Sequence, residues 1–105
     1  MRLEVIIPTY NRAQLLPVCL KSLSVARVPE GMTVGVTVVD NNSKDDTPAV
    51  VENWKQHFGG RLNYIFEKQQ GRSSALNAGI RGSESELVGF IDDDEEIDPT
   101  WYEAV

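Results

Sequence analysis

Cysteine and histidine are almost missing from this sequence, and so are long apolar segments. The single cysteine, Cys19, excludes an internal disulfide and a cysteine-based zinc cluster, and the single histidine, His57, leaves no pair for a zinc site. Cys19 falls on an apolar helical stripe, so we expect it in the core. No window approaches the roughly 20 apolar residues of a membrane span, and residues 1–5 run directly into an apparent strand without a signal peptide. We therefore expect a cytoplasmic location, with peripheral attachment to a membrane left open for a longer protein.

Positive charge is scarce as well. Ten Lys and Arg against sixteen Asp and Glu give a formal net charge of -6, which argues against nucleic acid or an anionic membrane surface as a general partner. An anionic ligand would therefore need a local cation. The length of 105 residues, with 41% hydrophobic and 25% charged residues, fits one small globular domain.

Four apolar runs of strand length alternate with three segments of helical periodicity. This β-α-β-α-β-α-β order predicts an α/β fold with a doubly wound, mostly parallel sheet and right-handed crossovers. The second apolar run has the composition of a strand buried on both faces, and the last run has the length and the aliphatic and aromatic content of a buried strand. The expected strands are 3–7, 34–39, 62–66 and 87–91, and the expected helices are 12–23, 47–58, 75–81 and, after Asp98 and Pro99, 101–105.

Polar residues before these helices predict where they begin. Asn11 is a candidate N-cap for the first helix, Thr47 for the second, and Ser73 or Ser74 for the third, which should stop before Gly82. Pro17 conflicts with the first helix, because a proline inside a helix kinks it or moves its start.

The final strand runs into six carboxylates within seven residues, Asp92 to Asp98. Carboxylates this close repel one another unless a cation sits among them, and a hard divalent cation such as Mg²⁺ or Mn²⁺ takes oxygen ligands of this kind. A solvated acidic turn that caps the next helix is the alternative. The run lacks the mid-loop glycine of an EF-hand, so a calcium module fits it poorly.

Polar residues follow every expected strand, and in a parallel sheet these ends meet at one edge. Tyr10 offers an aromatic face to a base, the Asp40 carboxylate can accept a hydrogen bond from an imide N–H, and Arg72 can compensate phosphate charge. Neither G-x-G-x-x-G nor G-x-x-x-x-G-K-[ST] is present, so a diphosphate would depend on a metal held by the carboxylates after the last strand. The pattern predicts a nucleotide pocket.

Four segments in register resemble the successive signatures of glycosyltransferase family 2. They are Ile6-Ile7-Pro8-Thr9-Tyr10-Asn11-Arg12, Val38-Val39-Asp40-Asn41-Asn42-Ser43, Gly71-Arg72-Ser73-Ser74-Ala75-Leu76-Asn77-Ala78-Gly79 and Phe90-Ile91-Asp92-Asp93-Asp94. The resemblance covers nearly the whole chain. It implies the GT-A fold, a nucleotide-diphosphate sugar donor of the UDP or dTDP type, a divalent metal, Mn²⁺ or Mg²⁺, and an inverting transfer to an acceptor that the residues do not identify.

The resemblance also implies a set of site residues. For Asn11, Arg12, Asn42 and Asn77 a purely local structural role is equally open. The implied metal ligands are Asp94 and Asp92, and the implied nucleotide-binding residues are Pro8, Thr9, Tyr10, Asn11, Arg12, Asp40, Asn42, Arg72, Asn77, Asp92 and Asp93.

The resemblance implies no catalytic residue within this chain and places the general base beyond Val105, because members of the family carry it in an acceptor-binding half well beyond the D-x-D motif. We therefore expect residues 1–105 to be a single donor-binding half-domain, truncated after that motif. Such a chain should be catalytically silent alone and should self-associate through an open sheet edge at its last strand, 87–91. The alternatives are a non-catalytic nucleotide-sugar-binding module, or a nucleotidyltransferase-like domain, which would normally show a Gly- and Arg-rich loop after the first strand.

Overall fold

The computed structural model describes residues 1–81, 85 and 87–105 and contains a four-stranded sheet in the order β3-β2-β1-β4. All three strand pairs are parallel, which confirms the predicted sheet. The elements are β1 (Arg2–Thr9), α1 (Leu16–Val25), β2 (Thr33–Asp40), α2 (Thr47–Trp54), the 3₁₀ helix η1 (Lys55–Phe58), β3 (Leu62–Phe66), α3 (Arg72–Arg81), β4 (Leu87–Phe90) and the 3₁₀ helix η2 (Trp101–Ala104).

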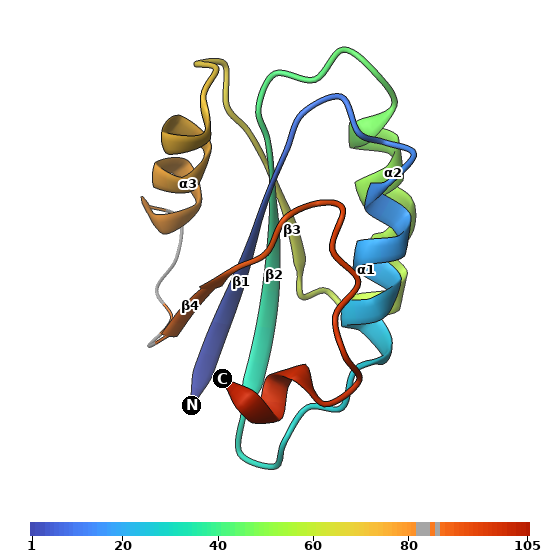
Figure 1. Ribbon diagram of the computed structural model, residues 1–105, viewed down its shortest axis with the longest axis vertical. Helices are drawn as coiled ribbons and strands as arrows, with labels where there is room; N and C mark the ends of the chain where they lie inside the picture. Colours follow the sequence, from blue (N-terminus) through green and yellow to red (C-terminus); the bar gives the residue numbers. More distant parts are fainter. Residues whose placement is uncertain (82–84, 86) are drawn as a thin grey trace.

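Helices cover both faces of the sheet, with α1 and α2 on one side and α3 on the other (Figure 1). The larger core lies on the α1 side, where Val5, Val36 and Leu20 are almost fully buried. A smaller core of Ile6, Val39, Ala75 and Ala78 lies under α3. Successive residues of β1 therefore enter two different cores, which explains why this strand reads as a continuous apolar run.

Helix α1 begins at Leu16, so the predicted cap at Asn11 is wrong. Pro17 lies in the first turn of α1, where a backbone N–H would have no hydrogen-bond partner within the helix. The N–H that proline lacks is therefore not needed there, and Pro17 does not kink the helix. Asn11 instead adopts a positive φ of 51° in the loop before the helix, a conformation that Asn tolerates better than most residues.

The starts of the next two helices also differ from expectation. Thr47 is the first residue of α2, where a backbone N–H has no partner within the helix. The Asp45 carboxylate accepts hydrogen bonds from the Thr47 backbone N–H at 3.1 Å and from the Thr47 hydroxyl at 2.6 Å. Helix α3 begins at Arg72, so Ser73 and Ser74 lie inside it rather than capping it. The expected stop at Gly82 lies outside the described residues.

Strand β4 is apolar but is not buried as predicted. Leu87, Val88 and Phe90 are 38%, 37% and 43% exposed, and only Ile91, just after the strand, is buried. The strand order explains the difference, because β4 pairs with β1 at the end of the sheet as the structure describes it. Apolar composition does not distinguish an edge strand from a central one.

The segment after β4 folds back onto α1. The Ile97 backbone N–H donates to the Ser22 hydroxyl at 3.1 Å, and the buried Tyr102 hydroxyl donates to the Leu23 carbonyl at 3.2 Å. Cys19 is fully buried on the same helix, as predicted. None of the helices in the described part of the chain has the length and apolar character needed to span a membrane.

Candidate nucleotide-binding site

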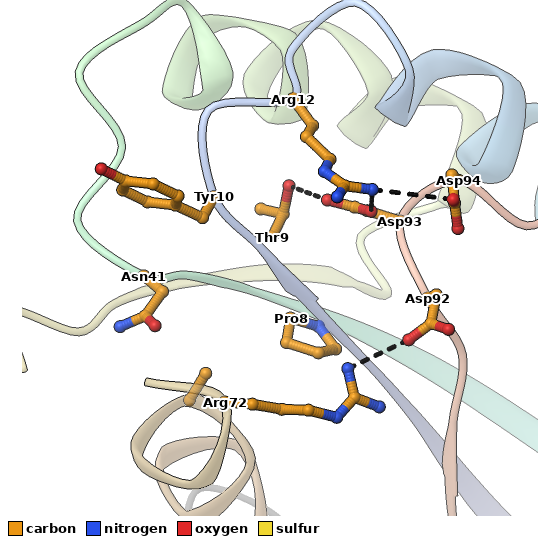
Figure 2. Close-up of a pocket in the computed structure, with 10 residues that line it drawn as sticks. Pro8, Thr9, Tyr10, Arg12, Asn41, Arg72, Asp92, Asp93 and Asp94 are labelled. Atoms are coloured by element: carbon orange, nitrogen blue, oxygen red, sulfur yellow. Dashed lines mark hydrogen bonds and ion pairs between the residues drawn. The ribbon is translucent and has the colours of Figure 1, made fainter. Parts of the chain in front are cut away.

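A pocket of about 430 Å³ opens at the carboxyl ends of β1, β2 and β4 (Figure 2). The parallel register brings these ends together: Thr9 pairs with Asp40, and the Ile91 N–H donates to the Ile6 carbonyl, which carries the chain after β4 to the same edge. We call it the strand-end pocket. Its lining residues are Pro8, Thr9, Tyr10, Arg12, Asn41, Arg72, Ala75, Asp92, Asp93 and Asp94.

Asp93 is the buried member of the D-x-D run, which we define as Asp92–Asp94. Its carboxylate accepts a hydrogen bond from the Thr9 hydroxyl at 2.8 Å and from Arg12 Nη1 at 3.3 Å. Burial raises the pKa of Asp93 above its ordinary value, although the Thr9 hydrogen bond and the Arg12 charge act in the opposite direction. Asp93 therefore ties the D-x-D run to the end of β1.

Asp92 and Asp94 have half-exposed carboxylates in the strand-end pocket, and each is paired with an arginine. Arg72 Nη1 lies 3.1 Å from Asp92 Oδ1, and Arg12 Nη1 lies 3.6 Å from Asp94 Oδ2. Figure 2 shows the two guanidinium groups reaching the D-x-D run from opposite walls. The pocket thus holds three carboxylates and two guanidinium groups.

The residues present fit a divalent cation that shares its coordination with a ligand. Across residues 1–81, 85 and 87–105, no three His, Cys, Asp or Glu side chains are grouped so that they could hold a metal by themselves. Mg²⁺, however, is usually bound by one or two carboxylates, with substrate phosphates and water completing the coordination. Asp92 and Asp94 could supply such a pair of hard oxygen ligands.

Asn41 lines the pocket but was not among the predicted site residues. Its amide donates to the carbonyls of Glu67 and Gln69 at 3.3 and 2.7 Å, and its Oδ1 accepts from the Gly71 N–H at 2.9 Å. Asn41 thereby holds the loop that leads into Arg72. The sequence signal for Asn41 is that a polar residue directly follows a buried strand. Its hydrogen-bond partners lie 26 to 30 residues away, so the sequence does not reveal them. Ala75, the other unpredicted lining residue, carries no polar signal.

Asp40 is fully buried and does not line the pocket. One carboxylate oxygen accepts from the Ser43 N–H at 2.8 Å, and the other accepts from the Tyr64 hydroxyl at 2.5 Å. Burial raises the pKa of Tyr64, and the Asp40 hydrogen bond and charge act in the same direction. The predicted contact between Asp40 and a base edge stays a prediction, and both oxygens of this carboxylate already accept hydrogen bonds within the protein.

Three predicted asparagines also lie outside the pocket lining. Asn11 joins two loops, since its Oδ1 accepts from the Lys44 N–H at 2.7 Å and its N–H donates to the Ser43 hydroxyl at 2.8 Å. Asn42 has a positive φ of 69° and accepts from the Lys44 ammonium at 3.1 Å. Asn77 is exposed on α3. Their nucleotide-binding roles stay predictions, whereas Pro8, Thr9, Tyr10, Arg12, Arg72 and the D-x-D run share one pocket.

The general base, expected beyond Val105, stays a prediction. Val105 follows η2, is 47% exposed and does not line the strand-end pocket. Figure 1 shows this end of the chain toward the amino ends of the strands, away from the carboxyl edge where the pocket opens. The carboxylates that line the pocket all belong to the D-x-D run, which the resemblance assigned to the donor and the metal.

An open parallel sheet with a polar pocket outside its carboxyl edge is characteristic of nucleotide-binding α/β domains. Within that class, the sequence pattern described as Glycosyl transferase family 2 matches residues 4–105. The chain belongs to this family, and its fold is the GT-A fold of the solved relatives.

Individual relatives match most of this chain. A GalNAc(5)-diNAcBac-PP-undecaprenol beta-1,3-glucosyltransferase of Campylobacter jejuni is 36% identical over 98 residues, covering 91% of this chain and 30% of that protein. TarS of Staphylococcus aureus in complex with UDP has a TM-score of 0.88 at 28% identity, covering 99% of this chain and 30% of that one. The mannosyltransferase PcManGT of Pyrobaculum calidifontis, in complex with GDP-Man and Mn²⁺, has a TM-score of 0.79 at 33% identity, covering 88% of this chain and 27% of that one. This chain therefore spans less than a third of the length of these relatives.

Proposed function

We propose that the strand-end pocket binds a nucleotide-diphosphate sugar of the UDP or dTDP type together with Mn²⁺ or Mg²⁺. The protein to which this site contributes would then transfer the sugar, with inversion, to an acceptor. The observation that carries the proposal is the placement of Arg12, Arg72 and the D-x-D run in one pocket at the carboxyl edge of the sheet. Family membership supports the same reading.

The ligands of two similar proteins support this donor class. TarS has been solved with UDP and with UDP-GlcNAc, at TM-scores of 0.88 and 0.81. PcManGT has been solved with GDP-Man and Mn²⁺. All three ligands contain a nucleoside diphosphate, and the acidic pocket of this chain could accept one only with added positive charge.

Each pocket residue has a chemical task in this proposal. Tyr10 is 45% exposed and can stack on the base, while Arg72 and Arg12 can donate hydrogen bonds to diphosphate oxygens. Asp93, held by Thr9, keeps its neighbours Asp92 and Asp94 facing the pocket. A bound divalent cation would neutralise negative charge on the diphosphate, both while the donor is bound and as the nucleoside diphosphate leaves.

Inversion is supported by the linkages in the names of two relatives. The Campylobacter protein is a beta-1,3-glucosyltransferase and TarS is a beta-N-acetylglucosaminyltransferase. A single in-line displacement on an α-linked donor gives a β-linked product. The acceptor hydroxyl needs a base on the far side of the sugar carbon from the phosphate, and the three carboxylates that line this pocket lie on the diphosphate side in our proposal.

Calorimetric titration of UDP with Mn²⁺ and with EDTA tests the proposal. UDP should bind weakly in EDTA and more tightly with Mn²⁺, because the diphosphate otherwise faces Asp92–Asp94 uncompensated. Asp94→Asn should remove most of this difference. Glu96→Gln is the matched control, since it removes one charge from the same acidic run but lies outside the pocket lining. The same UDP affinity in EDTA and in Mn²⁺ would overturn the metal-bridged site.

A transfer assay separates an enzyme from a binding module. UDP-sugar hydrolysis or transfer by a longer protein containing this chain is the expected result. Metal-dependent UDP binding with no turnover by that protein would instead support a non-catalytic nucleotide-sugar-binding module.

A further inference from the structure

We propose that Arg72 is an exchangeable counter-cation. In this view it competes with the divalent cation for Asp92 and moves to the diphosphate when both ligands bind. The inference rests on the proposed function and adds a thermodynamic consequence: metal and nucleotide bind with positive coupling, and Arg72 supplies part of that coupling.

The competition follows from the geometry of the carboxylate. Arg72 Nη1 lies 3.1 Å from Asp92 Oδ1, and Asp92 is one of the two carboxylates that would hold the divalent cation. A guanidinium at this distance repels a divalent cation at the same carboxylate. Metal binding therefore either displaces Arg72 or proceeds against its charge, and both routes weaken metal binding.

The two arginines of the pocket are held differently, and this selects Arg72. Arg12 bridges Asp94 and the buried Asp93, which is itself fixed by the Thr9 hydroxyl. Arg72 extends from the first residue of α3, has a side chain that is 61% exposed, and pairs with the half-exposed Asp92. Arg72 can leave its partner at little cost, since exposed ion pairs are weak. Arg12 is the anchored cation.

Charge balance explains why the exchange needs both ligands. The strand-end pocket carries three carboxylates and two guanidinium groups, a net charge of one negative unit. A divalent cation alone would reverse that sign, and the dianionic diphosphate of a nucleotide sugar alone would triple the negative charge. Bound together they restore the original net charge, and Arg72 can then exchange its carboxylate partner for a phosphate oxygen. Each ligand therefore lowers the electrostatic cost of binding the other.

A binding cycle on the 105-residue chain tests the inference. The dissociation constant of Mn²⁺ is measured without nucleotide, by the electron paramagnetic resonance signal of free Mn²⁺, and again with saturating UDP. Arg72→Gln should bind Mn²⁺ alone about two- to fivefold more tightly, the scale of an exposed ion pair. Arg72→Gln should bind UDP in EDTA more weakly. The dissociation constant of Mn²⁺ without nucleotide, divided by that with saturating UDP, should be smaller for this variant than for the unmodified chain. Arg72→Lys should return the Mn²⁺ affinity toward that of the unmodified chain.

Arg81→Gln is the matched control, because it makes the same charge change in the last turn of the same helix, outside the pocket lining. It should leave both Mn²⁺ constants within error. Unchanged or weaker binding of Mn²⁺ alone by Arg72→Gln would overturn the inference and leave Arg72 as a simple phosphate ligand. The failure of the proposed function looks different: the unmodified chain would then bind Mn²⁺ but show no effect of UDP.

Discussion

Asp40 is a buried carboxylate that joins two strands at the edge of the sheet where the pocket opens. It accepts hydrogen bonds from the Ser43 N–H and the Tyr64 hydroxyl, so it fixes the turn after β2 to the neighbouring strand β3. Its location at the carboxyl end of β2 also places it next to Asn41, a lining residue of the strand-end pocket. A base that reaches the Asp40 oxygen bonded to Tyr64 would share or replace that hydrogen bond.

We predict that the chain prefers UDP to CDP and that Tyr64→Phe strengthens UDP binding. The N3–H of uracil can donate to Asp40, whereas the cytosine ring nitrogen has no matching hydrogen, and the substitution releases the oxygen that Tyr64 occupies. Asp40→Ala should weaken UDP binding by about 1–3 kcal/mol, the scale of a hydrogen bond to a charged group. Calorimetry with Mn²⁺ measures all of these affinities, and equal affinity for CDP and UDP would contradict the role of Asp40.

Cys19 should be inert in the folded chain. The thiol is fully buried, and burial, followed by the charge of Asp93, raises its pKa to about 12. Because only the thiolate reacts, the reactive fraction at pH 8 is about 10⁻⁴. Labelling with a disulfide reagent should be slow in buffer and fast in concentrated urea, where the ordinary thiol pKa returns. Rapid labelling in buffer would show that α1 opens readily or that the thiol is accessible.

At the scale of elements, the position of Arg72 depends on how closely α3 lies on the sheet. Gly79 permits this approach, since a Cβ at that position would lie 2.6 Å from Ile6 Cγ2. Ala75 and Ala78 face the same small core. Small residues on one side of α3 therefore set the distance between this helix and β1. That distance in turn sets the position of Arg72 in the wall of the strand-end pocket.

Gly79→Ala should destabilise the fold by about 1–3 kcal/mol, the cost of overpacking a core. Helix propensity alone predicts the opposite sign, because alanine stabilises a helix relative to glycine. Urea unfolding measures the effect. In the double variant with Ile6→Ala, which removes the clashing methyl group, the two costs should be less than additive. A more stable Gly79→Ala variant would mean that α3 does not pack this closely.

At the scale of the whole molecule, the sheet ends in an apolar strand. Leu87, Val88 and Phe90 of β4 are each more than one third exposed, and no strand of the described chain pairs with the outer edge of β4. Apolar edge strands of this kind form hydrogen bonds with other chains unless a charge or a covering segment prevents it.

The 105-residue chain should therefore form dimers or larger assemblies at micromolar concentration, as measured by analytical ultracentrifugation. Val88→Lys should shift the chain toward monomer, because a charge on an edge strand disfavours pairing. Val25→Lys is the control: Val25 is 68% exposed but lies on α1, away from the sheet edge. A monomer at these concentrations for the unmodified chain would contradict the prediction.

The order of the elements and the location of the pocket could be predicted from the sequence alone. Strand-length apolar runs alternating with helical periodicity specify a parallel sheet, and parallel strands bring their carboxyl ends to one edge whatever their order. Tyr10, Arg72 and the D-x-D run were assigned to one pocket for this reason, and they share it. The four motifs in register also indicated the family to which the chain belongs.

Only the tertiary structure decided how far the side chains of β4 are exposed, where α1 begins, and which charges meet. Local patterns report a residue's own preference for burial or for a backbone conformation, so they could not distinguish the exposed β4 from a central strand. Arg72 and Asp92 are 20 residues apart, and Thr9 and Asp93 are 84 apart. Contacts over such separations depend on the final positions of whole elements. The burial of Asp40 beside Tyr64 and the ion pair between Arg72 and Asp92 became visible only when those elements were in place.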